Sequence, residues 1–175
     1  MCVENETSHR NWCRIFHPAL GIYRQSLYFY PVMGNTIIIH SVDHATAALA
    51  AAEQFDRPVT LLSAPAAAAY LGATVFRDMI AAAAELHPRA RHQAVLDCGD
   101  DPGLAMGALR HGIKGVRITN GKVIRDKLAD IAGQRGAFVY EDGGETIDLL
   151  GMTDPLAACR AWLAHAADAT ETGDG

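Results

Sequence analysis

Short apolar runs alternate with alanine-rich stretches five times along this chain. Each apolar run has the length of a strand and ends at a Gly, Pro or polar residue, after which a stretch of helical composition begins. The predicted strands are 36–40, 59–63, 93–97, 115–119 and 137–141. The predicted helices are 43–55, 65–86 with a break at Gly72, 101–111, 121–134 and 154–167.

Strands that are nearly continuous apolar runs are typical of parallel sheets, because helices cover both faces of such sheets. The pattern therefore predicts an open, three-layer α/β domain with a mostly parallel core of five strands. Two forms fit the length of the chain, a flavodoxin-like sheet and a half-barrel-like sheet.

After the fifth predicted strand the pattern becomes less regular. Gly143 and Gly144 lie between two apolar segments, 138–140 and 146–149. A glycine pair between two such segments is the usual signature of a tight turn. We expect an antiparallel edge hairpin near the C-terminus.

The composition changes abruptly near Met33. Residues 1–32 contain half of the aromatic residues of the chain and a single alanine, whereas alanine dominates after Gly34. We interpret 1–32 as an N-terminal extension, either disordered or not native, 33–168 as a single α/β domain and 169–175 as a disordered tail. The alternative for 1–32 is an arm that docks its aromatic side chains on the domain or on a second copy.

Charge and composition exclude several classes of partner. The net charge of -5 and the pI near 5.9 offer no basic surface to a nucleic acid. Half of the residues are hydrophobic, yet no uninterrupted apolar run reaches the roughly 18 residues that a membrane helix needs. The first ten residues are polar, and the four cysteines are scattered without a CxxC pair. We expect a cytoplasmic protein without a nucleic-acid or membrane partner.

Polar residues follow several predicted strands, and the carboxyl ends of parallel strands meet at one edge of a sheet, where ligands bind. This edge predicts a site for a small molecule, with an anion favoured at 119–122, where a helix begins beside a lysine. The candidate ligand-binding residues are Ser41, Asp43, Ser63, Cys98, Asp100, Asp101, Thr119, Asn120 and Lys122.

An enzyme is the first alternative. Asp97 ends the third predicted strand, and Asp97 with Asp101 could hold a divalent cation such as Mg²⁺, which prefers oxygen ligands. His44 would then serve as acid or base in a metal-assisted lyase or hydrolase. A homo-oligomeric interaction protein, a homodimer formed through the aromatic arm or the helix containing Trp162, is the second alternative.

Helix capping also explains most of these polar residues one by one. Asp43, Ser63, Asp100 and Asn120 lie where predicted helices begin, and such residues are preferred caps. Asp97 has no such role, which makes it the first functional candidate.

Other residues have plainer explanations. We expect Cys98 to be a small buried residue and His40 to be a hydrogen-bonded histidine. Gly103 and Gly107 are expected to allow close packing of one helix face.

Residues 108–119, Ala-Leu-Arg-His-Gly-Ile-Lys-Gly-Val-Arg-Ile-Thr, resemble the helix, glycine and strand repeat of (β/α)8-barrel enzymes of the aldolase type. The segment from Ala94 to Ala105 resembles the preceding unit, so the similarity covers residues 86–119. The resemblance implies a strand-end carboxylate or lysine and a phosphate site. No lysine lies inside a predicted strand, and five units cannot close a barrel alone.

Overall fold

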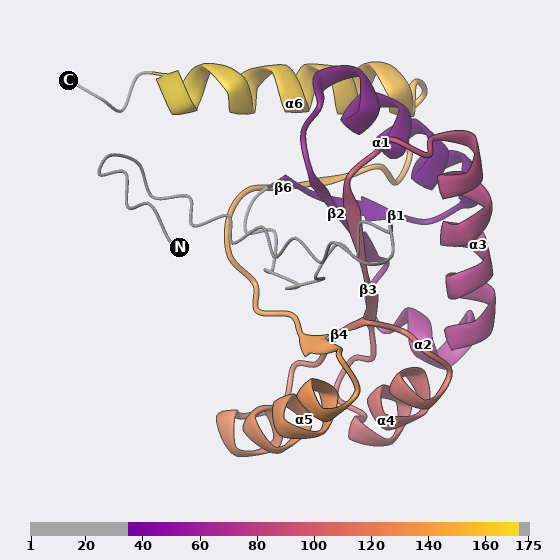
Figure 1. Cartoon of the computed structure of the whole chain (residues 1–175), viewed down its shortest axis with the longest axis vertical. Coiled ribbons are helices and arrows are strands. Elements are labelled where there is room, and N and C mark those ends of the chain that lie inside the picture. The colour runs from indigo at the N-terminus through magenta and orange to yellow at the C-terminus, as the bar shows by residue number, and fades with distance from the viewer. Residues whose placement is uncertain (1–34, 172–175) are drawn as a thin grey trace, which may run out of the picture. The chain divides into compact units, whose positions relative to one another are not determined.

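The computed structural model describes residues 35–171 of the 175-residue chain, and side chains as far as His165. Strands and helices alternate through most of this part (Figure 1). The strands are β1 (Thr36–Ile39), β2 (Val59–Ser63), β3 (His92–Asp97), β4 (Gly115–Arg117), β5 (Phe138–Val139) and β6 (Thr146–Asp148). The helices are α1 (Val42–Phe55), α2 (Ala67–Tyr70), α3 (Ala73–Leu86), α4 (Pro102–Arg110), α5 (Lys122–Gln134) and α6 (Pro155–Glu171).

All strand pairs in the described sheet are parallel, and the strand order is β5-β4-β3-β2-β1-β6. The predicted parallel α/β domain is therefore confirmed. Of the two forms expected, the sequential order from β1 to β5 matches the half-barrel-like sheet, because a flavodoxin-like sheet has the order 2-1-3-4-5.

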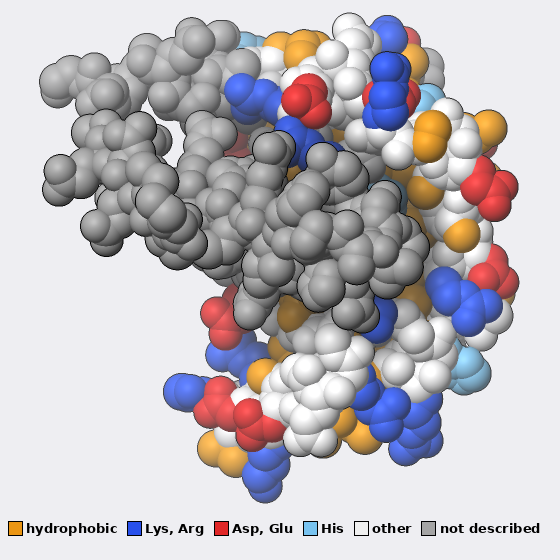
Figure 2. All heavy atoms as spheres, viewed as in Figure 1, with side chains coloured by type: hydrophobic (Ala, Val, Ile, Leu, Met, Phe, Trp, Pro, Cys, Tyr) orange, Lys and Arg blue, Asp and Glu red, His pale blue; other side chains and the backbone are white. Residues whose placement is uncertain are grey.

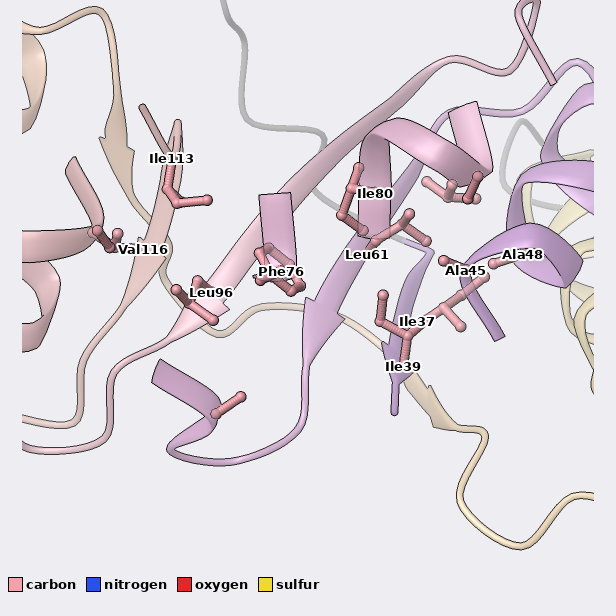
Figure 3. Close-up of a cluster of buried hydrophobic side chains, with 14 of the residues drawn as sticks. Ile37, Ile39, Ala45, Ala48, Leu61, Phe76, Ile80, Leu96, Ile113 and Val116 are labelled. Carbon is pink, nitrogen blue, oxygen red and sulfur yellow. The ribbon is translucent and has the colours of Figure 1, made fainter. Parts of the chain in front are cut away.

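The main core lies between the strands and the helices. Ile37, Leu61 and Leu96 point from β1, β2 and β3 toward Phe76 and Ile80 of α3 (Figure 3). Side chains of α1, α2, α4, α5 and α6 complete this cluster. Figure 1 shows the described helices in an arc on one side of the strands, so residues 35–171 supply the sheet and one helical layer.

The opposite face of the sheet, which we call the inner face, has a separate apolar cluster. Leu62, Val95 and Tyr140 are buried there with Ile38 and Phe138 beside them, and no helix residue belongs to this cluster. Successive side chains of a strand point to opposite faces, so the two clusters follow from alternate positions of the same strands.

The sheet is curved like part of a (β/α)8 barrel. The register of the paired strands shows which residue on the β5 side lies opposite Thr36. Counted from Thr36 through β2, β3 and β4, that residue is Gly136, just before β5. Tyr140 lies four residues beyond Gly136, yet its hydroxyl is 2.9 Å from the hydroxyl of Thr36. In a flat sheet the two strands would be about 19 Å apart. Four residues over four strand steps is one residue per strand, the stagger that closes an eight-stranded barrel.

The predicted antiparallel hairpin is wrong. β6 pairs in parallel with β1, at the opposite edge of the sheet from β5. The reason is the helix-side core: beside β1, Leu149 is fully buried together with Cys159 and Leu163 of α6. A hairpin with β5 would remove this apolar segment from its position next to β1 and α6, and burial of apolar surface is the dominant stabilising term.

The predicted extension, 1–32, lies outside the described residues, as do the last four residues of the chain. α6 continues to Glu171, four residues beyond the predicted end of that helix. Among the described residues, no helix has the length and hydropathy to span a bilayer.

Candidate functional site

Charged and titratable side chains gather where the strands end on the inner face. Along β1, β2 and β3, the inward positions before the last one are apolar or neutral, as at Ile38, Leu62 and Val95. The inward positions at the carboxyl ends of strands are different in character. They are His40 after β1, Asp97 in β3, Arg117 in β4 and Asp148 in β6. Because all strands are parallel, these residues lie at one edge.

Asp97 and Arg117 form a pair across β3 and β4. They are opposite each other in the strand register, and Arg117 Nη1 donates to Asp97 Oδ2. The remaining edge of the guanidinium contacts Asp142: Nε donates to Oδ1 and Nη2 to Oδ2, both at 2.8 Å. This two-point geometry is the strongest that arginine makes with a carboxylate. The hydrogen bonds to Asp142 and Asp97 raise the pKa of Arg117, so the guanidinium stays charged.

The Asp97 carboxylate also holds two loops. Its Oδ1 accepts hydrogen bonds from the backbone amides of Ala66, at 2.9 Å, and Gly99, at 2.8 Å. Its own amide donates to Ser63 Oγ at 2.9 Å. With only 2% of its surface exposed, Asp97 fixes the loops after β2 and β3 and orients Arg117. This is a positioning role.

A second cluster lies at the ends of β1 and β6. His40 Nε2 is 2.7 Å from Asp148 Oδ1, which also accepts from the Leu150 amide. The His40 amide donates to His44 Nδ1 at 3.3 Å, and the two rings are perpendicular with centroids 6.0 Å apart. Neutral His44 therefore has its proton on Nε2, the ring nitrogen that does not accept this bond.

Burial and the neighbouring His40 lower the pKa of His44. The pKa of Asp148 is also lowered: desolvation alone would raise it, but the hydrogen bonds from Leu150 and His40 outweigh that effect. At neutral pH this cluster thus consists of an ionised carboxylate, an imidazole oriented by it, and a neutral imidazole that can donate from Nε2.

The sequence-predicted candidates have several local roles. Ser41 caps α1 by accepting from the His44 amide, and Asp101 caps α4 by accepting from two amides. Asp101 therefore has the capping role expected of Asp100. Asp43 is an exposed residue in the first turn of α1, and Ser63 bonds to Asp97 instead of capping a helix.

The predicted anion site at 119–122 is only partly assembled. Gly121 is the N-cap of α5 and supplies no side-chain hydrogen bond. Thr119 and Asn120 are tied to the loop after β3, through the carbonyls of Gly99 and Asp100. Lys122 pairs with Asp126 at 2.8 Å, and Figure 2 shows acidic and basic side chains side by side around α5.

The residues proposed for a metal do not form a set of ligands. Between Asn35 and His165, no group of three or more His, Cys, Asp or Glu side chains is placed to hold a metal ion. Asp101 caps α4, whereas the Asp97 oxygens are taken up by Arg117 and two backbone amides. Asp97 and Asp101 therefore do not fit a Mg²⁺ site.

Cys98 is nearly inaccessible, with 1% of its surface exposed. Desolvation and the nearby charges of Asp97 and Asp101 raise its pKa to about 12. A nucleophilic cysteine needs its thiolate, so Cys98 fits the plainer interpretation of a small buried residue.

Three residues of this edge were missed from the sequence, namely Arg117, Asp142 and Asp148. A charged residue at the last position of an apolar strand was the available signal for Arg117 and Asp148. His40 was expected to be hydrogen-bonded, and its contact with Asp148 confirms that expectation.

Comparison with known proteins identifies a fold and no family. No family model matches the chain, and no curated protein matches it. A solved structure of a proposed fructose-1,6-biphosphate aldolase from Coccidioides immitis is similar in fold, with a TM-score of 0.51 and 19% sequence identity. The similarity covers 61% of this chain and 44% of that one, so the chain spans less than half of the length of this relative.

The fold and this comparison define an α/β protein whose parallel sheet is built like part of an aldolase-type barrel. The sequence resemblance to aldolase-type repeats is thus confirmed at the level of the fold.

Proposed function

We propose that this protein binds a small anionic molecule at the carboxyl edge of its inner face. One observation carries the proposal: the inward side chains change from apolar or neutral to charged or titratable at the carboxyl ends of β1, β3, β4 and β6. A sheet that needed only a core would have no reason to place its charged and titratable inward side chains at this one end. Ligands of parallel α/β sheets bind at this edge.

Three groups at this edge can donate to an anion. Arg117 carries a permanent charge, and His44 can donate from Nε2. The N-terminus of α5 has no side-chain cap, and the free amides of a helix N-terminus attract negative charge. The related structure is that of an aldolase named for fructose-1,6-biphosphate, which makes a sugar phosphate a sensible probe.

Titration calorimetry with inorganic phosphate and with fructose 1,6-bisphosphate tests this proposal. His44→Gln should weaken binding about tenfold, because a hydrogen bond to a charged group contributes about 1.5 kcal/mol or more. His92→Gln is a matched control, since His92 begins β3 at the amino edge of the sheet. If neither probe binds, or if the control weakens binding as much as His44→Gln, the proposal is wrong.

An enzyme is the second candidate, and the contact between His40 and Asp148 favours it. A carboxylate that orients an imidazole through one nitrogen leaves the other nitrogen to accept a proton. We propose His40 and His44 as the acid and base residues of a lyase or hydrolase, with Asp97 positioning Arg117. Release of triose phosphate from fructose 1,6-bisphosphate is the assay, and loss of that activity in His40→Gln is the expected result. If wild-type protein releases no triose phosphate, this lyase reaction is not its function.

A further inference from the structure

The segment Glu141–Glu145 joins β5 to β6, which lie at opposite edges of the sheet. We call this segment the strap. Six residue steps separate Tyr140 from Thr146, and an extended chain of that length reaches about 20 Å. The strap therefore crosses from one edge of the curved sheet to the other. All five of its residues are exposed.

Asp142 is the strap residue that contacts the site. Both of its carboxylate oxygens accept from the Nε and Nη2 edge of Arg117, each at 2.8 Å. The two partners of Arg117 differ sharply in exposure: the Asp97 side chain is 2% exposed and the Asp142 side chain 67%. Asp97 is thus a fixed part of the site, whereas water reaches Asp142 and weakens its pairing.

The contact of Asp142 with Arg117 has the geometry that a carboxylate or phosphoryl ligand makes with arginine. Asp97, held by the amides of Ala66 and Gly99, keeps the guanidinium oriented, so the Nε and Nη2 edge would keep its direction if Asp142 left. Gly144, with φ +100°, adopts a backbone conformation that side chains disfavour, and glycine also permits the strap to change course.

We propose that Arg117 is the residue that binds the anion and that Asp142 occupies its place until the ligand arrives. A ligand carrying a carboxylate or phosphoryl group displaces Asp142 and moves the strap. This inference rests on the proposed anion site and adds the ligand group that the site recognises. If Asp142 stayed in place, the charges of Asp97, Asp142 and Arg117 would sum to one negative charge, which would repel an anion.

The test compares Asp142→Asn with Glu145→Gln. Both remove one negative charge from an exposed strap residue, but only Asp142 contacts Arg117 among the described contacts. Calorimetry with inorganic phosphate and with malonate, at constant ionic strength, should show about fivefold tighter binding for Asp142→Asn than for wild type. In wild type the ligand must displace the Asp142 carboxylate, and an exposed ion pair of this kind lowers the affinity by about that factor. Glu145→Gln should stay within about twofold of wild type by the same reasoning.

A second readout follows the strap in the wild-type protein. The amide resonances of Gly143 and Gly144 should shift as phosphate is added, and should shift less in Asp142→Asn. Equal affinities of the two variants, with binding by wild type intact, would overturn this inference and leave the anion site standing. Failure of all three proteins to bind either probe would overturn both.

Discussion

Gly115 leaves room for the ring of Phe138 on the inner face. A Cβ at Gly115 would lie 2.8 Å from Phe138 Cζ, 2.7 Å from the carbonyl oxygen of Ala94 and 2.9 Å from Val95 Cγ2. All three atoms belong to residues of the sheet, and the Ala94 carbonyl oxygen is a backbone atom that cannot move without shifting β3. Gly115→Ala should therefore destabilise the protein by about 1–3 kcal/mol, the usual cost of overpacking. Urea unfolding followed by circular dichroism measures the change.

Gly107→Ala is the matched control. No atom lies within 4 Å of a Cβ built at Gly107, so the predicted close packing at this glycine is wrong. Since alanine is the better helix former, this variant of α4 should be more stable by up to about 1 kcal/mol. If both alanine variants changed stability in the same direction, the contrast between the crowded position of Gly115 and the open position of Gly107 would be wrong.

Arg117→Met should destabilise the protein more than loss of a surface ion pair. Asp97 is buried, and removing its guanidinium partner leaves a buried charge that costs about 3 kcal/mol. The double variant Asp97→Asn with Arg117→Met should recover most of this loss, because no buried charge remains. Chemical unfolding of wild type, Arg117→Met, Asp97→Asn and the double variant gives the coupling energy between the two side chains. A loss below about 1 kcal/mol for Arg117→Met would mean that the pair behaves as an exposed one.

The parallel core could be predicted because it depends on local pattern. The runs at 36–40 and 93–97 are too apolar for a sheet with one solvent-exposed face, and alanine-rich helices follow them. The position of β6 could not be predicted. Gly143-Gly144 is a local turn signal, whereas the edge that β6 joins depends on burial of Leu149 under α6, a contact distant in sequence.

The site was predictable as an edge, but its partners were not. Asp97 was singled out as a strand end, yet its contact with Arg117 depends on the register of β3 and β4, which no sequence pattern fixes. The helix caps were displaced by a residue or two for a similar reason. Ser41 and Asp101 have the extended backbone that an N-cap requires, whereas Asp43 already lies inside α1.

The hydrogen bond between Thr36 and Tyr140 should act as a clamp across the curved sheet. Thr36 is 1% exposed and Tyr140 8%, so Tyr140→Phe leaves a buried hydroxyl with one partner fewer. We expect a loss of about 1–2 kcal/mol. Thr36→Val with Tyr140→Phe removes both hydroxyls and should cost less than the sum of the single changes. Strict additivity in urea unfolding would show that the two hydroxyls do not interact.

His44 predicts a pH dependence of stability with a definite sign. Its folded pKa lies below the ordinary value of 6.5, because of burial and the neighbouring His40, with Asp43 and Asp148 acting in the opposite direction. Between the folded pKa and 6.5 the unfolded chain binds more protons at this site than the folded chain, so the free energy of unfolding rises with pH. The loss of stability caused by His44 thus grows as the pH falls below 6.5.

His44→Gln should remove this contribution, so that its free energy of unfolding changes less than that of wild type between pH 7.5 and pH 5. The comparison isolates His44 because His40 and Asp148 remain in both proteins. A proton NMR titration of the His44 ring gives the folded pKa directly. A midpoint above 6.5, or an unchanged pH slope in the variant, would contradict the lowered pKa of His44.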